Sequence, residues 1–258
     1  MARVALITGG GRGIGRAIAT VFAADGIAVA IAGRNAEALE ATAAAVEAAG
    51  GSVSTHVCDV SSESAVDKLF SEALDRHGEI DILVNNAALE GPTAPIAEVE
   101  VSDWDAVQGV NVRGSFLCTR LAARHMVPRR SGHILFLSAL GGGLRAYPLR
   151  SPYAVSKAAI LALTQTAAAE LRPKGIGVNA ITPGPVLGER LDRVFRRRAE
   201  ETGATVEQVA RGFADKAPAG RFPSEEEIAR VALWLCGPDA DMIVGQSINV
   251  MGGIDISL

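Results

Sequence analysis

The chain alternates short apolar runs with longer segments in which apolar residues recur at helical spacing. Ile14, Ile18 and Phe22 illustrate this spacing, which places them on one face of a helix. Seven runs are predicted to be strands: residues 4–8, 28–32, 53–57, 80–84, 134–138, 177–181 and 247–250. Most are apolar throughout, which is typical of parallel strands covered by helices on both faces. The pattern therefore predicts an α/β fold, a doubly wound, Rossmann-like parallel sheet of about seven strands.

One segment, residues 184–218, departs from this alternation. It is rich in charged and turn residues, and two short helices are expected around residues 202–204. Leu191, Val194 and Phe195 stand at helical spacing within it and predict an apolar underside. Because ligands of such sheets bind beyond the carboxyl ends of the strands, the segment is expected to be a substrate lid. With 258 residues and no linker, residues 1–258 are expected to form a single domain.

Two helix starts are predicted from capping-box patterns. Ser102 with Asp105, and Ser224 with Glu227, each precede a run of helical period. In such a box the hydroxyl accepts a hydrogen bond from the backbone, and the acidic side chain accepts one in return.

Composition and charge disfavour several classes of protein. The 25 basic and 29 acidic side chains give a formal net charge of −4, which argues against a nucleic-acid partner. No apolar run approaches the roughly 18 residues of a membrane span, and the first residues lack a signal-peptide core, so a soluble cytoplasmic protein is expected. The cysteines, Cys58, Cys118 and Cys236, are odd in number and widely spaced, which predicts buried thiols rather than disulfides or a metal site.

The strongest candidate for chemistry follows the first predicted strand. A glycine-rich turn opens a helix there, and the turn residues expected to contact a cofactor are Gly9, Gly11, Arg12, Gly13, Ile14 and Gly15. Glycines let the backbone approach a pyrophosphate, and the helix N-terminus adds N–H groups and the positive end of its dipole. A tight turn without a ligand is the alternative, but it explains less well why the glycines gather at the first crossover.

The end of the second predicted strand indicates which dinucleotide binds. A carboxylate there typically holds the ribose of NAD, whereas an arginine accommodates the 2′-phosphate of NADP. The chain has Arg34 at this point and no acid before Glu37. Helped by Arg12, Arg34 favours NADP(H) through bidentate bonds to the phosphate, with NAD(H) as the alternative. An arginine that is merely solvated is the other interpretation.

Tyr153 and Lys157 are the leading catalytic candidates. They stand four residues apart at the start of a segment of helical period, so they share one helix face. A phenol has an ordinary pKa near 10, and a nearby ammonium group favours the phenolate, which brings Tyr153 within reach of acid–base chemistry at neutral pH. Chance and surface pairing also produce this spacing, so its weight comes from its occurrence beside a phosphate-binding turn.

Along essentially its whole length the chain resembles the short-chain dehydrogenase/reductase family, of the compact type. The resemblance rests on the glycine turn, Asp59-Val60, Asn85-Asn86-Ala87, Asn111 within Gly109-Val110-Asn111-Val112, the pair Tyr153 and Lys157, and Pro183-Gly184. It implies an enzyme similar to 3-oxoacyl-thioester reductases that transfers hydride between a nicotinamide and a small alcohol or ketone. A homotetramer is usual in that family.

The resemblance also implies roles for individual residues. Asp59 and Val60 would flank the adenine, and further cofactor contacts would come from Asn85, Ala87, Tyr153, Lys157, Pro183, Gly184 and Val186. Lys157 would hold the nicotinamide ribose, and Asn111 would position a water that completes a proton relay from Tyr153. A structural alternative stands beside each role, because Asn111 could bond a neighbouring backbone group and Asp59 could be a turn residue.

The chain departs from the family pattern at the catalytic serine. Counted forward from Gly132 the usual serine position falls on Ala139, whereas the hydroxyl is at Ser138. Side chains alternate along a strand, so a shift of one residue turns a side chain to the other face. Ser138 is nominated as the catalytic serine on the expectation that the glycines after it absorb the shift. Gly188 is a second departure, at a position where the family often has a threonine.

These observations favour an NADP(H)-dependent oxidoreductase that interconverts a secondary alcohol and a ketone. The first alternative is an NAD-dependent dehydrogenase of a sugar, polyol or cyclic alcohol. The second is a non-catalytic dinucleotide-binding protein, suggested by the displaced serine. A run of arginines in residues 184–218 is consistent with an acidic substrate, but such runs are more often solvated helix faces. The run comprises Arg190, Arg193, Arg196, Arg197 and Arg198.

Overall fold

The computed structural model describes residues 2–254 of the chain. Seven parallel strands form one sheet in the order β3-β2-β1-β4-β5-β6-β7. The strands are β1 (Val4–Thr8), β2 (Ala28–Gly33), β3 (Val53–Val57), β4 (Ile82–Asn85), β5 (Gly132–Leu137), β6 (Ile176–Pro183) and β7 (Ser247–Val250). The direction of winding reverses between β1 and β4, and ligands of such sheets bind at this switch point. The predicted doubly wound, Rossmann-like sheet is confirmed.

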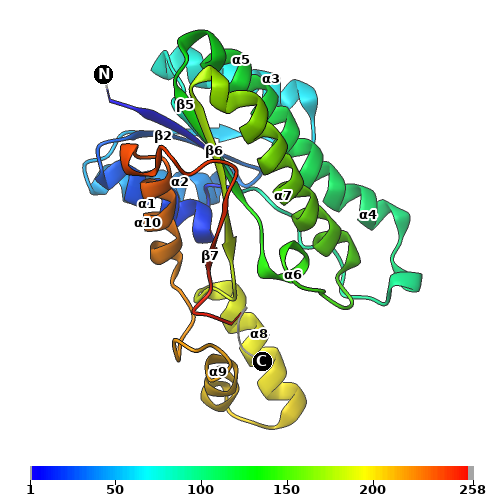
Figure 1. Ribbon diagram of the computed structural model, residues 1–258. Coiled ribbons are helices and arrows are strands. Elements are labelled where there is room, and N and C mark those ends of the chain that lie inside the picture. The colour runs from blue at the N-terminus through cyan, green and yellow to red at the C-terminus, as the bar shows by residue number, and fades with distance from the viewer. Residues whose placement is uncertain (1, 255–258) are drawn as a thin grey trace.

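Helices cover both faces of the sheet (Figure 1). One face carries α1 (Gly13–Ala24), α2 (Ala36–Ala48) and α10 (Glu225–Leu235). The other carries α3 (Glu63–His77), α5 (Ser115–Arg129) and α7 (Ser151–Leu171). The shorter elements are the helices α4 (Val101–Gln108) and α6 (Leu140–Gly143), a π-helix η2 (Gly109–Gly114), and the 3₁₀ turns η1 (Ile96–Glu98), η3 (Arg172–Lys174) and η4 (Pro238–Ala240).

The central strands are apolar on both faces because each face packs against helices. Leu6 and Ala30 pair across β1 and β2 and belong to the core beneath α3, α5 and α7. The next pair, Ile7 and Ile31, points to the opposite core beneath α1, α2 and α10. Two apolar layers therefore hold the sheet, which explains why the strand sequences do not alternate with polar residues.

Two helices, α8 (Glu189–Thr202) and α9 (Val206–Ala214), project beyond the carboxyl ends of β6 and β7 (Figure 1). They meet at Gly203, as expected, and share a small apolar core of their own. Leu191 and Phe195 are buried in that core, but Val194 is 38% exposed, so its expected place on the underside was wrong. The reason is the helical period, because the buried face repeats at residues 191, 195 and 199.

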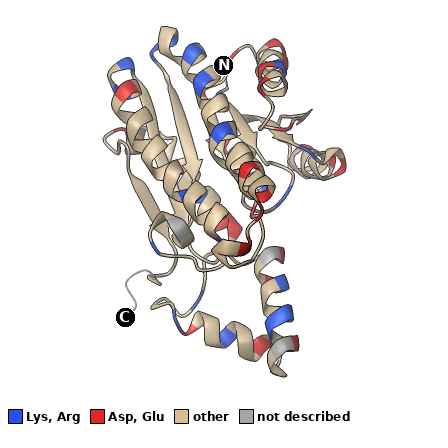
Figure 2. Ribbon diagram, turned by 90° about the vertical axis from the view of Figure 1, so that its right-hand side faces the viewer, with Lys and Arg blue, Asp and Glu red and all other residues tan. Residues whose placement is uncertain are grey.

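The described arginine side chains of α8 are solvated, and the basic residues of this helix are marked in Figure 2. The side chain of Arg190 lies outside the described residues. Arg193, Arg196 and Arg198 are exposed, and the Arg198 guanidinium lies 5.9 Å from the centroid of the Phe213 ring in α9. The described side chains therefore favour the solvated-face interpretation of this charge run.

The three cysteines are buried thiols, as predicted. Burial raises the pKa of the Cys118 thiol to about 12 and that of Cys58 to about 11, so both are protonated at neutral pH. Within residues 2–254 no helix is long and apolar enough to cross a membrane.

The two predicted capping boxes had different outcomes. Ser224 caps α10: its Oγ accepts from the Glu227 backbone N–H at 3.1 Å, and the Glu227 carboxylate accepts from the Ser224 N–H at 2.9 Å. Ser102 does not cap α4, because that helix begins one residue earlier and Glu100 stands at its N-cap without a side-chain bond. The prediction at Ser102 was therefore wrong.

We expect Ser224→Ala to lower the free energy of unfolding by about 1 kcal/mol, because the first turn of α10 loses its cap. Ser102→Ala is the matched control and should change stability by less than about 0.5 kcal/mol. Urea unfolding followed by circular dichroism measures both. Equal destabilisation by the two substitutions would contradict the assignment of the caps.

Candidate active site

The glycine turn between β1 and α1 is folded so closely that side chains are excluded from it. Gly9 and Gly13 have φ angles of +70° and +58°, a region that favours glycine. A β-carbon at Gly15 would lie 2.2 Å from the Gly9 carbonyl oxygen. The Asn86 Nδ2 group donates to the carbonyls of Thr8 and Gly9, at 2.9 and 3.1 Å, and holds the turn from the far side.

The N-terminus of α1 is left open by the protein. Its N-cap residue, Arg12, makes no side-chain capping bond, and the first turn has no acidic residue. In contrast, α2 and α3 are capped by the side chains of Asn35 and Ser62. The first N–H groups of α1 therefore point out beside the glycine turn, which is the arrangement that binds phosphate groups.

The ends of β1 and β4 are joined by side-chain hydrogen bonds at the switch point. Thr8 Oγ1 donates to the Val84 carbonyl at 3.2 Å and accepts from the backbone N–H groups of Asn86 and Ala87, each at 3.1 Å. Asn85 Nδ2 donates to Thr119 at 3.1 Å, and its buried Oδ1 has no partner among the described residues. The sequence motif did not predict the structural role of Asn86.

Arg34 and Asp59 are exposed at the ends of β2 and β3. The Asp59 carboxylate accepts from the backbone N–H and the hydroxyl of Ser61, at 2.9 and 2.7 Å. These bonds, with a smaller contribution from the Arg34 charge, lower the pKa of Asp59. Arg34 therefore stands at the rim of the sheet where the sequence placed it, with a carboxylate in its neighbourhood.

The remaining expected cofactor contacts surround the same edge of the sheet. Val60 and Ala87 line a narrow crevice with Thr8 and Asn85. On the other side of the switch point, Pro183 ends β6 beside Val250, and Gly184 is in close contact with Met251, where a β-carbon would lie 2.5 Å from the methionine Cβ. Ile14 and Val186 pack partly against the core.

Tyr153 and Lys157 lie together on α7, at the carboxyl end of β5. The Lys157 Nζ is 5.6 Å from the centroid of the Tyr153 ring and donates to the Leu137 carbonyl at 2.7 Å. Both side chains are buried, and Tyr153 is only 5% exposed. The shared helix face predicted from their spacing is therefore present, and the Leu137 bond fixes the ammonium group at the end of β5.

Asn111 lies in the π-helix η2, and its side-chain amide forms hydrogen bonds to the loop after β4 and to α7. Its Nδ2 donates to the Leu89 carbonyl and to Ser156 Oγ, each at 2.9 Å, and its Oδ1 accepts from the Leu89 N–H at 2.7 Å. Ser156 Oγ in turn donates to the Tyr153 carbonyl at 2.7 Å. Asn111 thus ties the loop after β4 to the helix that carries Tyr153, through Ser156, a residue that the sequence did not single out.

The Ser138 side chain is directed toward α7. Its Oγ donates to the backbone carbonyl of Lys157 at 2.9 Å, and the side chain is only 4% exposed. A hydroxyl has one proton to donate, so Ser138 does not offer a hydrogen bond to a substrate oxygen in this arrangement. Gly143 lies against its hydroxyl, since a β-carbon at Gly143 would lie 2.8 Å from the Ser138 Oγ.

Two side chains that the motifs did not indicate border Tyr153. Tyr147 packs its ring against the Tyr153 ring in an edge arrangement with centroids 6.3 Å apart. The Arg150 guanidinium lies 5.8 Å from both centroids. It also bonds to Glu90 at 3.0 Å and to Thr93 at 2.8 Å. A signal was present in the sequence, because Arg150 precedes Tyr153 by three residues and faces the same side of the helix start.

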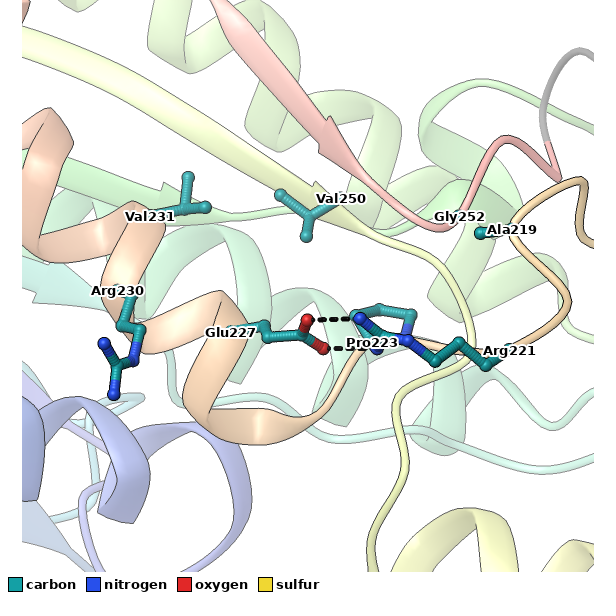
Figure 3. Close-up of a pocket in the computed structure, with 8 residues that line it drawn as sticks. All are labelled: Ala219, Arg221, Pro223, Glu227, Arg230, Val231, Val250 and Gly252. Atoms are coloured by element: carbon teal, nitrogen blue, oxygen red, sulfur yellow. Dashed lines mark hydrogen bonds and ion pairs between the residues drawn. The ribbon is translucent and has the colours of Figure 1, made fainter.

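A separate cavity of about 370 Å³ lies between α10, the end of β7 and residues 219–223 (Figure 3). Arg221 and Glu227 line it and form a bidentate ion pair with bonds of 2.8 and 2.7 Å. None of the expected catalytic side chains lines this cavity, so it is distinct from the site around Tyr153.

Comparison with known proteins identifies the family. A family model described as "Enoyl-(Acyl carrier protein) reductase" matches residues 9–255. The chain is 39% identical to sorbitol dehydrogenase of Cereibacter sphaeroides, over 97% of this chain and 96% of that protein. It is 32% identical to the 3-oxoacyl-[acyl-carrier-protein] reductase of Thermotoga maritima, over 98% of both chains. The crystal structure of an NAD⁺-bound xylitol dehydrogenase superposes with a TM-score of 0.90 at 34% identity, over 97% of this chain and 98% of that one.

The chain belongs to the short-chain dehydrogenase/reductase family. It is thus an oxidoreductase of a family whose solved structures include one with NAD⁺ and one with NADPH, which leaves the non-catalytic alternative without support. The residues of this dehydrogenase/reductase fit a dinucleotide, because the turn has no room for side chains where a backbone must approach phosphate, and no side chain caps the start of α1 beside it. The close contact of Gly15 with Gly9 makes the fit sensitive to a single methyl group.

We expect Gly15→Ala to weaken NADPH binding by at least about tenfold and to destabilise the fold by about 1–3 kcal/mol, because the added methyl group forces the turn apart. Gly212→Ala is the matched control, since a β-carbon there meets nothing within 4 Å. Titration of NADPH fluorescence and thermal unfolding measure the two effects. Unchanged NADPH affinity in Gly15→Ala would show that the turn does not hold the cofactor.

Proposed function

We propose that this short-chain dehydrogenase/reductase interconverts a secondary alcohol and a ketone with NADP(H), using Tyr153 as the general acid and base. The observation that carries the proposal is the buried pairing of Tyr153 with Lys157 at the carboxyl end of β5. Relatives of both kinds support the reaction class, since one is named a sorbitol dehydrogenase and another a 3-oxoacyl-[acyl-carrier-protein] reductase.

The proton chemistry follows from the positions of the two side chains. When bound, NADP(H) supplies or accepts the hydride. In reduction Tyr153 donates its phenolic proton to the oxygen that becomes the alcohol, and in oxidation its phenolate accepts that proton. The ammonium group of Lys157 favours the phenolate because it places positive charge beside the ring. Lys157 is itself fixed by the Leu137 carbonyl, so this charge does not depend on the bound substrate.

Binding of the cofactor is assigned to the edge of the sheet around the switch point. The turn residues Gly9 to Gly15 would hold the pyrophosphate with the N-terminus of α1. Asp59 and Val60 would border the adenine, and Asn85, Ala87, Pro183, Gly184 and Val186 would line the rest of the dinucleotide. The helices α8 and α9 project at this edge and would close over the substrate as a lid.

The preference for NADP(H) rests on Arg34 and Arg12. Both are exposed at the rim where the adenosine ribose would lie, and β2 ends at Gly33 without a carboxylate that could hold a ribose diol. The competing candidate is an NAD-dependent polyol dehydrogenase, because the chain is 37% identical to galactitol 2-dehydrogenase of Agrobacterium fabrum. Initial rates with ethyl acetoacetate, cyclohexanol and sorbitol, each with both cofactors, separate these candidates.

We expect Tyr153→Phe to lower kcat by at least about 10³-fold, because the phenyl ring keeps the packing but has no proton to transfer. The affinity for NADPH, measured by fluorescence titration, should stay within about twofold of the unsubstituted enzyme. Turnover retained in this variant would refute the assignment of Tyr153. A fall in NADPH affinity as large as the fall in kcat would point instead to damage of the cofactor site.

We expect Arg34→Leu to lower kcat/KM for NADPH by about 10- to 100-fold, the value of a lost charge-assisted bond to phosphate. The value for NADH should change little, because NADH has no 2′-phosphate. Arg76→Leu, an exposed arginine in the last turn of α3, is the control and should affect neither cofactor. Faster turnover with NAD than with NADP across the substrate panel would overturn the preference.

A further inference from the structure

Carbonyl reduction places negative charge on the carbonyl oxygen, and preorganised hydrogen-bond donors around that oxygen lower the barrier. In the proposed function Tyr153 is one donor, and it gives up its proton during the reaction. A second donor that keeps its proton would hold the oxygen throughout. Ser138 does not supply this donor, because its proton is directed to the Lys157 carbonyl.

The neighbouring residue offers no hydroxyl either. Ala139 has extended backbone angles, φ −160° and ψ 156°, so its side chain faces opposite to the buried side chain of Ser138. The position that leaves the core therefore has a methyl group, which donates no hydrogen bond. The end of β5 thus leaves the oxygen of a substrate without a donor from the strand.

Tyr147 brings a hydroxyl-bearing side chain to Tyr153 from a different segment. It is 41% exposed, and its ring packs edge-on against the buried Tyr153 ring with centroids 6.3 Å apart. The chain has only 2 tyrosines, and both meet here. Tyr147 thus places a partly exposed phenol next to the buried phenol of Tyr153.

Two contacts fix the Tyr147 ring in this place. Gly141 leaves room for it, because a β-carbon there would lie 2.4 Å from the Tyr147 Cδ1 atom. The Arg150 guanidinium lies 5.8 Å from both tyrosine rings and is itself held by Glu90 and Thr93. The cation therefore lies against both tyrosine rings and helps to hold them together.

We propose that the Tyr147 hydroxyl donates a hydrogen bond to the reacting oxygen of the substrate. It would take the place of an outward-facing hydroxyl, which the end of β5 does not have. The proposal rests on the proposed function of Tyr153. In reduction the carbonyl carbon would gain a C–H bond from a hydride whose C–H bond at C4 of the reduced nicotinamide breaks, which oxidises that ring. The π electrons of the C=O bond move to oxygen, and the Tyr153 proton passes to that oxygen. Tyr153 is left as the phenolate, and Tyr147 retains its proton.

The test compares Tyr147→Phe, Ser138→Ala, Tyr153→Phe, and Tyr147→Phe combined with Ala139→Ser. Steady-state kinetics are measured with NADPH and ethyl acetoacetate, and with sorbitol and NADP⁺ in the oxidative direction. Tyr147→Phe should lower kcat about 10²-fold, the usual cost of removing one such donor. Its NADPH affinity and melting temperature should stay unchanged. Ser138→Ala should lower kcat less than Tyr147→Phe does. Adding Ala139→Ser to Tyr147→Phe should raise kcat at least about tenfold above that of Tyr147→Phe alone, because it places a hydroxyl at the outward position of the strand.

The remaining outcomes would contradict either the role of Tyr147 or the proposed function. If Tyr147→Phe stays within about threefold of the unsubstituted enzyme while Tyr153→Phe is inactive, the role of Tyr147 is wrong and the proposed function stands. If the loss in Tyr147→Phe is not rescued by Ala139→Ser and is accompanied by weaker NADPH binding or a lower melting temperature, Tyr147 is structural. If Ser138→Ala causes the larger loss, the donor is the serine. An unsubstituted enzyme without turnover on any alcohol or ketone removes the proposed function itself.

Discussion

Hydrogen bonds between the ends of β1 and β4 hold the glycine turn after β1 next to the loop after β4, and the candidate site is built on these two segments. Thr8 and Asn86 exchange these bonds: the threonine hydroxyl accepts from the loop after β4, and the asparagine amide donates to the glycine turn after β1. One strand end presents the turn that would hold phosphate, and the other begins the loop that reaches Asn111. Because both segments leave the sheet at the same switch point, small side-chain bonds there set the geometry of binding and catalysis together.

Hydrogen bonds between β5 and α7 determine which group the Ser138 hydroxyl contacts. Lys157 Nζ donates to the Leu137 carbonyl, and Ser138 Oγ donates to the Lys157 carbonyl, so two bonds run in opposite directions between the strand end and the helix. These bonds hold Lys157 beside Tyr153. As a consequence, the Ser138 hydroxyl at the end of β5 is bonded to the helix. A shift of one residue along an extended strand thus changes the serine from a residue that could face substrate to one that anchors the lysine.

Much of the fold was predictable because strands that are buried on both faces of a sheet have sequences that are mostly apolar. Short, mostly apolar runs located all seven strands, with ends that differ by one or two residues, as at β6, which extends to Pro183 rather than to residue 181. Glycines located the turn, since close backbone approach excludes side chains. The errors arose where a local pattern competes with tertiary contacts. Ser102 has the pattern of a cap, but α4 begins before it, and Val194 lies at an apolar spacing on a face that meets solvent. Tyr147 and Arg150 carry no motif, because their contacts depend on how the loop after β5 folds back.

Three of the four buried side-chain polar atoms that have no partner among the described residues lie near the candidate site: Asn85 Oδ1, Arg150 Nε and Ser151 Oγ. The fourth is Arg120 Nε in α5, a residue whose guanidinium pairs with Glu63. Each such atom costs about 1–3 kcal/mol when it is left unpaired. Asn85 ends β4 at the switch point, and Arg150 and Ser151 open the helix that carries Tyr153. A bound ligand would supply partners to polar atoms at this edge of the sheet, so part of the stability that they cost is recovered on binding.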